Sequence, residues 1–200
     1  MTNSFANITG IGTAGNVGSW NNYLNIWVNL GNVGGWTLKM MTVSPKGEIH
    51  AVGTEGNVGE WNGSGWDNEG HFGGWTLKQL VWGPDGTLWG VGTESNVGRW
   101  DEHEWENLGN LGGWTLKMLA FGPDGTMYGV GTEGNVGKWV NDAWDDQGNL
   151  GDWTLTMLAF DKAGQMWCIG TEGNVGQWNG TGWTNLGKPG DWTMAWLCFS

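Results

Sequence analysis

Three residue types suited to binding a polar ring recur together along this chain of 200 residues. A glutamate and an asparagine lie in the string TEGNVG, which occurs three times and is varied once each to TAGNVG and TESNVG. A tryptophan lies in the phrase GGWTLK and in its variants GDWTLT and GDWTMA. An indole offers a flat apolar surface to a sugar ring, a carboxylate accepts hydrogen bonds from hydroxyls, and an amide can bind an acetamido group. The repeated residues are therefore candidates for carbohydrate binding.

The candidate set has one asparagine and one GGW or GDW tryptophan per copy, and a glutamate in four copies. Its members are Glu55, Glu94, Glu133 and Glu172; Asn16, Asn57, Asn96, Asn135 and Asn174; and Trp36, Trp75, Trp114, Trp153 and Trp192. In the first copy the glutamate is replaced by Ala14, so the turn does not need the carboxylate. A single shallow site binds weakly, but five on one rigid body gain avidity of roughly 10²–10⁴ on a multivalent surface.

Each candidate type also has a structural interpretation. Serine replaces glycine in TESNVG, which suggests that this position does not require a positive φ. A left-handed Asn96 would explain the tolerance, and the asparagines are then mainly turn residues. Most tryptophans should pack between structural units. Glutamate has no backbone role of this kind and is the better functional candidate, although an exposed residue copied by recent duplication would look the same.

The candidates are positioned by a repeat of 39 residues, which is the constant spacing of the GGW and GDW tryptophans. In the unit that begins at Trp114, residues 114–121 predict a buried strand, GPDG predicts a type I turn, and residues 126–132 predict a second strand. Glu133–Asn135 predicts a turn, 136–140 a third strand, and a fourth strand starts near Trp144. Four-stranded units of about 40 residues indicate a β-propeller. TEGN and GGW then share one face, and the GPDG turns lie on the other.

The ends of the chain predict how the ring closes. Residues 1–11 match only the second strand of a unit, and the last nine residues match only the first strand. Pairing the C-terminal strand with the N-terminal one completes a unit and removes two exposed edges. We therefore predict one all-β domain over residues 1–200, a closed five-bladed β-propeller of four-stranded antiparallel blades.

The segment GGWTLKMLAFGPDGTMYGV, residues 112–130, resembles the repeat of the tachylectin-type five-bladed β-propeller lectins. The resemblance implies shallow sites for N-acetylglucosamine or N-acetylgalactosamine between neighbouring blades. The stretches NDAWDDQ and GTGWTNL, from Asn141 and Gly180, are shorter than the family's and lack its arginine, and TEGNVG matches no signature of the family. The expectation is a multivalent lectin for N-acetylated sugars, with up to five sites. The alternatives are a protein–protein interaction propeller and an idealised propeller without a selected ligand.

Composition and charge narrow the function classes further. A net charge of −12 with only eight lysines and arginines argues against nucleic acid or an anionic membrane surface as partner. No apolar run is long enough to span a membrane, and the N-terminus lacks the pattern of a signal peptide. The three histidines occupy unrelated repeat positions, and we find no catalytic motif, so we expect a non-enzymatic monomer without metal or cofactor. The two cysteines resemble small core residues.

Overall fold

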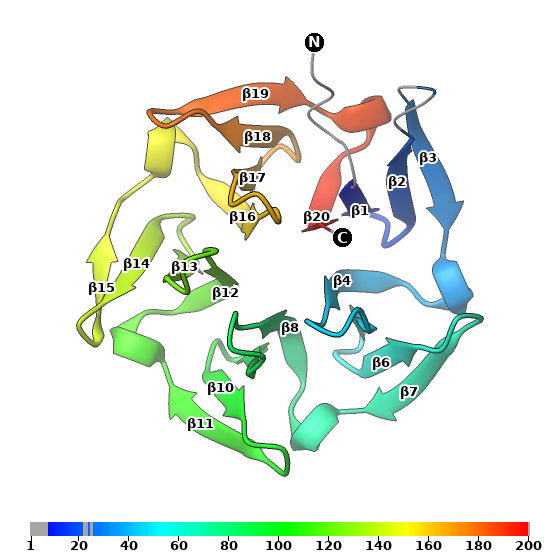
Figure 1. The fold of residues 1–200 in the computed structure, drawn as a ribbon, viewed down its shortest axis with the longest axis horizontal. Helices are drawn as coiled ribbons and strands as arrows, with labels where there is room; N and C mark the ends of the chain where they lie inside the picture. The colour runs from blue at the N-terminus through cyan, green and yellow to red at the C-terminus, as the bar shows by residue number, and fades with distance from the viewer. Residues whose placement is uncertain (1–7, 22–23, 25, 200) are drawn as a thin grey trace.

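The computed structural model describes residues 8–21, 24 and 26–199. Five four-stranded antiparallel sheets stand around a central axis as the blades of a closed propeller (Figure 1). Within each blade the four strands lie side by side, in order from the central axis to the rim. The predicted all-β, five-bladed architecture is therefore confirmed.

The strand bounds follow the repeat. Blade 1 contains β20 (Met194–Phe199), β1 (Ile8–Gly12), β2 (Val17–Asn21) and β3 (Ile26–Gly31). Blade 2 contains β4 (Leu38–Val43), β5 (Ile49–Gly53), β6 (Val58–Trp61) and β7 (Trp66–Gly70). Blade 3 contains β8 (Leu77–Trp82), β9 (Leu88–Gly92), β10 (Val97–Trp100) and β11 (Trp105–Gly109). Blade 4 contains β12 (Leu116–Phe121), β13 (Met127–Gly131), β14 (Val136–Val140) and β15 (Ala143–Asp146). Blade 5 contains β16 (Leu155–Phe160), β17 (Met166–Gly170), β18 (Val175–Trp178) and β19 (Trp183–Gly187).

A single 3₁₀ turn precedes the inner strand of each blade. These turns are η1 (Val33–Gly35), η2 (Phe72–Gly74), η3 (Leu111–Gly113), η4 (Leu150–Asp152) and η5 (Pro189–Asp191). They explain why the inner strand of blade 4 starts at Leu116 and not at Trp114 as predicted. The amide of Trp114 closes the η3 turn by donating to Leu111 (3.2 Å), so the ladder begins two residues later.

The expected arrangement of the ends is present in the sheet of blade 1. β20 pairs antiparallel with β1, and Gly10 lies opposite Leu197 in the register. The C-terminal strand is thus the innermost strand of blade 1, and the ring has no open edge between its first and last repeat (Figure 1). The part of this prediction that falls on residues 1–7 lies outside the described residues.

The core is richest in the inner two strands of the blades. Leu77, Leu116 and Leu155 begin successive inner strands and are completely buried. Each fourth strand has one buried or half-buried tryptophan and mostly exposed residues after it, as in β7 (WDNEG). Apolar residues are therefore concentrated near the axis, where neighbouring blades pack against each other, and polar residues lie at the rim.

The GPDG turns, which join the inner two strands of a blade, have the hydrogen bond expected of a four-residue turn. In GPDG the amide of Gly125 donates to the carbonyl of Gly122 (3.0 Å), which is the bond of a four-residue turn. The amide of Thr126 also donates to the carboxylate of Asp124 (3.0 Å), and this bond lowers the pKa of Asp124. Asp85 makes the equivalent bond in blade 3.

Candidate functional site

The TEGN turn joins two blades as well as two strands. Within blade 2 the amide of Thr54 donates to the carbonyl of Thr37 (3.1 Å) at the start of the inner strand. The carbonyl of Gly56 accepts from the amide of Leu77 (3.2 Å), where blade 3 begins. Equivalent bonds join Gly15 to Leu38, Gly134 to Leu155 and Gly173 to Met194. The repeated turn therefore has a structural task that explains much of its repetition.

The third residue of the turn does require a positive φ, contrary to the sequence prediction. Gly56 has a φ of 79°, and Ser95, which replaces it in TESNVG, has a φ of 69°. A Cβ at Gly56 would lie 2.4 Å from Cγ2 of Thr76, so glycine also serves close packing there. Ser95 is tolerated although the left-handed region costs a non-glycine residue roughly 1–2 kcal/mol. Its hydroxyl accepts a hydrogen bond from Nζ of Lys78 (2.7 Å), and burial lowers the pKa of that lysine.

The prediction of a left-handed Asn96 is wrong. None of the five turn asparagines is among the described residues with a positive φ, because the preceding residue takes that conformation. The carbonyl of Asn57 closes the turn by accepting from the amide of Gly53 (2.9 Å). The side-chain nitrogen Nδ2 of Asn57 donates a long hydrogen bond to Oδ1 of Asn68 (3.5 Å) in the fourth strand. Asn16, Asn135 and Asn174 donate to their fourth strands in the same way (3.4 Å each).

The tryptophans of the GGW phrases lie on glycines of their own blades. A Cβ at Gly59 would lie 2.9 Å from Cη2 of Trp36, and the indole packs against Trp66 with 6.0 Å between ring centroids. Trp75 and Trp114 cover Gly98 and Gly137 equally closely. The two tryptophans of the GDW phrases, Trp153 and Trp192, occupy corresponding sites over Gly176 and Gly18. All five remain half-buried and keep some surface for a ligand.

Two further sets of tryptophans recur once per blade and pair with each other in the outer two strands, edge-on in blades 2 to 5 and tilted in blade 1. The third-strand set is Trp20, Trp61, Trp100, Trp139 and Trp178, and the fourth-strand set is Trp27, Trp66, Trp105, Trp144 and Trp183. Trp61 meets Trp66 at 5.2 Å and 65°, and Trp100 meets Trp105 at 5.3 Å and 65°. Ring contacts of these sets stay within one blade, although Trp66 also packs in a cluster with Ile11 of blade 1. Ring contacts that cross between blades involve tryptophans that belong neither to these two sets nor to the GGW and GDW phrases, among them Trp82, Trp89 and Trp167.

The four glutamates stand apart from this packing. Glu55, Glu94, Glu133 and Glu172 are exposed, and their carboxylates make no hydrogen bond or ion pair with the described residues. In blade 3, Glu94 lies with Trp75 and Asn96 around a shallow hollow of about 210 Å³ that Thr76, Gly92 and Thr93 complete. The three predicted residue types thus meet at one place. They meet within one blade, whereas the resemblance placed the sites between blades.

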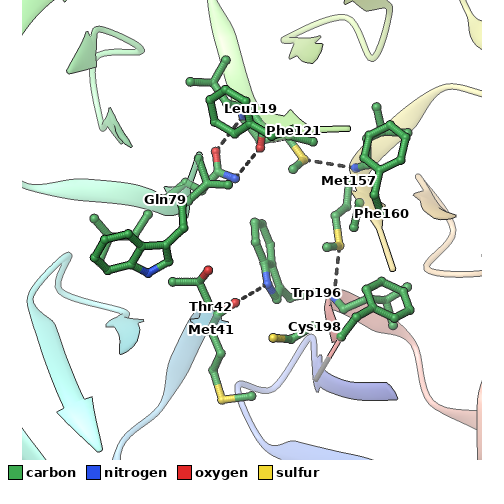
Figure 2. Close-up of a pocket in the computed structure, with 18 of the residues that line it drawn as sticks. Met41, Thr42, Gln79, Leu119, Phe121, Met157, Phe160, Trp196 and Cys198 are labelled. Atoms are coloured by element: carbon green, nitrogen blue, oxygen red, sulfur yellow. Dashed lines mark hydrogen bonds between the residues drawn. The ribbon is translucent and has the colours of Figure 1, made fainter. Parts of the chain in front are cut away.

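A second hollow follows the central axis and was not predicted. It measures about 180 Å³ and is lined by the five inner strands (Figure 2). Gln79 joins β8 to β12 by donating to and accepting from the backbone of Leu119, both at 2.7 Å. Trp196 of β20 donates from Nε1 to the carbonyl of Met41 in β4 (2.8 Å), across the junction between blades 1 and 2. Cys198 is the one titratable side chain among the described lining residues, and burial raises the pKa of its thiol to about 11.

The mouth of this channel on the GPDG face is another feature that the sequence reasoning missed. Each inner strand ends there, and its last residue is Val43, Trp82, Phe121, Phe160 or Phe199. Two hollows of about 370 and 550 Å³ at this mouth share Trp82, Phe199 and Lys162. The signal was available, because these five residues are also spaced by 39. Most of the described residues that line the mouth are apolar, and Asp161 and Lys162 are the charged ones.

The remaining titratable residues do not assemble. No group of three or more histidine, cysteine, aspartate or glutamate side chains that could hold a metal ion occurs in the described part of the chain. Cys168 and Cys198 are free thiols, and burial raises the pKa of both. Residues 8–21, 24 and 26–199 contain no helix long and apolar enough to cross a bilayer.

Comparison with known proteins identifies the fold and no family. The sequence matches no protein-family model and no curated protein. Among solved structures, the chain is similar to a symmetrical protein described in a study of de novo evolutionary emergence under folding constraints (17% identity, TM-score 0.64, 95% of this chain and 96% of the other). It is also similar to a putative gluconolactonase (17% identity, TM-score 0.62, 93% and 74%). A gluconolactonase from Xanthomonas campestris is comparable (16% identity, TM-score 0.59, 90% and 70%).

Proposed function

We propose that this protein is a multivalent binding protein that presents one weak site for N-acetylated sugars on each glutamate-bearing blade, as the resemblance to the tachylectin-type lectins implies. The observation that carries the proposal is the hollow of blade 3, where the free carboxylate of Glu94 lies beside Trp75 and Asn96. The equivalent glutamates of blades 2, 4 and 5 are exposed as well. A half-buried indole and an unpaired carboxylate are the two parts that a shallow sugar site needs.

The geometry also assigns the parts of such a site different roles. The asparagine amide is already engaged with the fourth strand in four blades, so it contributes to ligand binding only by giving up a long bond. The indole is fixed by the glycines beneath it and loses no conformational freedom on binding. Glutamate is the residue with free hydrogen-bonding capacity. It is therefore the residue whose replacement should affect binding most and folding least.

The proposal is tested by removing and by adding the carboxylate. A variant with Glu55→Gln, Glu94→Gln, Glu133→Gln and Glu172→Gln should lose at least about tenfold in affinity for N-acetylglucosamine displayed on a multivalent surface. Its midpoint of urea unfolding should stay unchanged because surface substitutions away from structural contacts cost little. The gain variant Ala14→Glu should raise the stoichiometry from four sites to five in calorimetry. Unchanged sugar binding in the fourfold variant, or no binding to any N-acetylated sugar on a glycan array, would contradict the proposal.

A second candidate is a propeller that acts as a protein-interaction surface or has no selected ligand. It is favoured by the structural tasks of TEGN and GGW, which account for their repetition without a ligand, and by the similarity to a symmetrical protein shaped by folding constraints. An interaction surface would also explain why three of the strongly exposed large apolar residues, Leu24, Ile26 and Leu30, lie on blade 1. A silent glycan array, together with fourfold variants that fold normally, would favour this candidate.

A further inference from the structure

Four of the five junctions between blades are filled by an aromatic pair. Each pair joins the second strand of one blade to the last residue of the inner strand in the next. The pairs are His50–Trp82 (5.8 Å between centroids), Trp89–Phe121 (5.8 Å), Tyr128–Phe160 (5.2 Å) and Trp167–Phe199 (5.5 Å). These contacts fill the space between neighbouring sheets near the GPDG face.

The junction between blades 1 and 2 has Thr9 and Val43 at the same two positions. The sheet register establishes the equivalence, since Thr9 lies opposite Cys198 as His50 lies opposite Thr42. Val43 lies opposite Ile49 as Trp82 lies opposite Leu88. Two ring systems are therefore replaced by two small branched side chains at this one junction.

The missing rings leave an apolar cavity of about 250 Å³ between the two blades. Thr9 and Val43 line it together with Val17, Leu30, Val33, Met41, Ile49, Trp61, Trp66 and Cys198. The indole Nε1 of Trp66 already donates to the carbonyl of Val33 (2.8 Å). The other polar side-chain groups of the described lining residues are the hydroxyl of Thr9, the indole N–H of Trp61 and the thiol of Cys198, and none of these residues is acidic, basic or a histidine.

We propose that this cavity is a binding site for a small uncharged aromatic molecule, of the size of an indole or a substituted benzene. The four filled junctions show that aromatic rings fit between these blades, and the cavity exceeds the roughly 150 Å³ that holds one benzene in a protein core. A charged ligand is disfavoured because its charge would be buried without a partner. Leu30 is 51% exposed at the edge of the cavity and gives an apolar ligand a surface to approach from.

The test uses the full chain with 5-fluoroindole as probe. Fluorine NMR titration should give saturable binding with a dissociation constant of about 0.1–1 mM, as expected for a ligand of ten heavy atoms. In methyl NMR spectra, the shifts should cluster on Leu30, Val43 and Ile49. The double variant Thr9→Trp/Val43→Phe, which restores an aromatic pair, should weaken binding at least tenfold.

A matched control opens a junction that is filled in the native chain. The variant Trp89→Thr/Phe121→Val should acquire a second site for 5-fluoroindole between blades 3 and 4. If the filling double variant does not fold, Val43→Phe alone with the methyl shifts of the native chain decides. Shifts that cluster away from this junction, undiminished binding in a filled variant, or a cavity closed by a second copy of the chain with no probe binding would each overturn the proposal.

Discussion

Trp105 and Trp27 occupy the same position in their blades and are almost equally buried, at 7% and 8% exposure. The indole Nε1 of Trp105 donates to the carbonyl of Phe72 (2.8 Å), and Trp66, Trp144 and Trp183 make the same bond to their own 3₁₀ turns. The indole Nε1 of Trp27 is buried without a hydrogen-bond partner among the described residues, and the corresponding turn in blade 1 is η5. The same repeated tryptophan thus has a hydrogen-bonded indole N–H in four blades and an unsatisfied one in blade 1.

This difference predicts unequal costs for the same substitution. Trp105→Phe should lower the free energy of unfolding by about 0.5–1.5 kcal/mol more than Trp27→Phe, because only the first change removes a side-chain hydrogen bond. The carbonyl of Phe72 keeps its other bond, from the amide of Trp75 (3.2 Å). Both changes remove the same volume, so the comparison isolates the hydrogen bond. Urea unfolding followed by far-ultraviolet circular dichroism measures both variants. Equal losses would show that packing alone determines the cost.

At the scale of elements, the inner strands are joined by a ring of side chains 39 residues apart. Gln79, Met118, Met157 and Trp196 each bond to the backbone of a neighbouring inner strand. The amides of Leu158 and Leu197 donate to the sulfurs of Met118 and Met157 (3.2 and 3.0 Å). Gln79 makes the strongest of these links because it satisfies both the amide and the carbonyl of Leu119.

Replacing Gln79 should reveal the value of this link. Gln79→Leu leaves the amide and the carbonyl of Leu119 buried without partners and should cost about 2–4 kcal/mol of unfolding free energy. Gln79→Met restores the residue found in the next two blades and should cost less, because its sulfur can accept from the Leu119 amide. Chemical denaturation of the two variants provides the comparison. A Met variant as unstable as the Leu variant would argue that sulfur acceptors contribute nothing here.

The same elements show what the sequence could predict. The 39-residue spacing and the split unit at the ends were sufficient for blade number, strand order and ring closure. The conformation of the TEGN turn was misjudged because Ser95 was taken as a sign of relaxed φ, whereas its bond to Lys78 helps a strained residue to persist. Links such as Gln79–Leu119 join residues 40 apart on neighbouring blades, and only the curvature of the ring brings them together. Of the site, the meeting of Trp75, Glu94 and Asn96 followed from strand order, but the empty junction at Thr9 and Val43 required the packing.

At the scale of the whole molecule, β20 is the element on which closure depends. It pairs with β1, and its Trp196 donates to Met41 of blade 2. Trp192, just before it, covers Gly12 and Gly18 of blade 1. Leu197 of β20 is buried in the core. The segment from Trp192 to Phe199 therefore completes a sheet, closes the ring and covers the glycines of blade 1.

A chain that ends at Asp191 should consequently lose more than one strand's share of stability. Without residues 192–200, β1 presents an unpaired edge and Gly12 and Gly18 lose their indole cover, so we expect a lower urea midpoint and self-association through the exposed edge. Size-exclusion chromatography with light scattering and urea unfolding measure the two effects. A synthetic peptide of residues 190–200 added to the truncated chain should restore the monomer and the native midpoint, whereas the same peptide with Trp196→Ala should do so less well. A truncated chain that stays monomeric with an unchanged midpoint would mean that the remaining blades hold the ring together without closure.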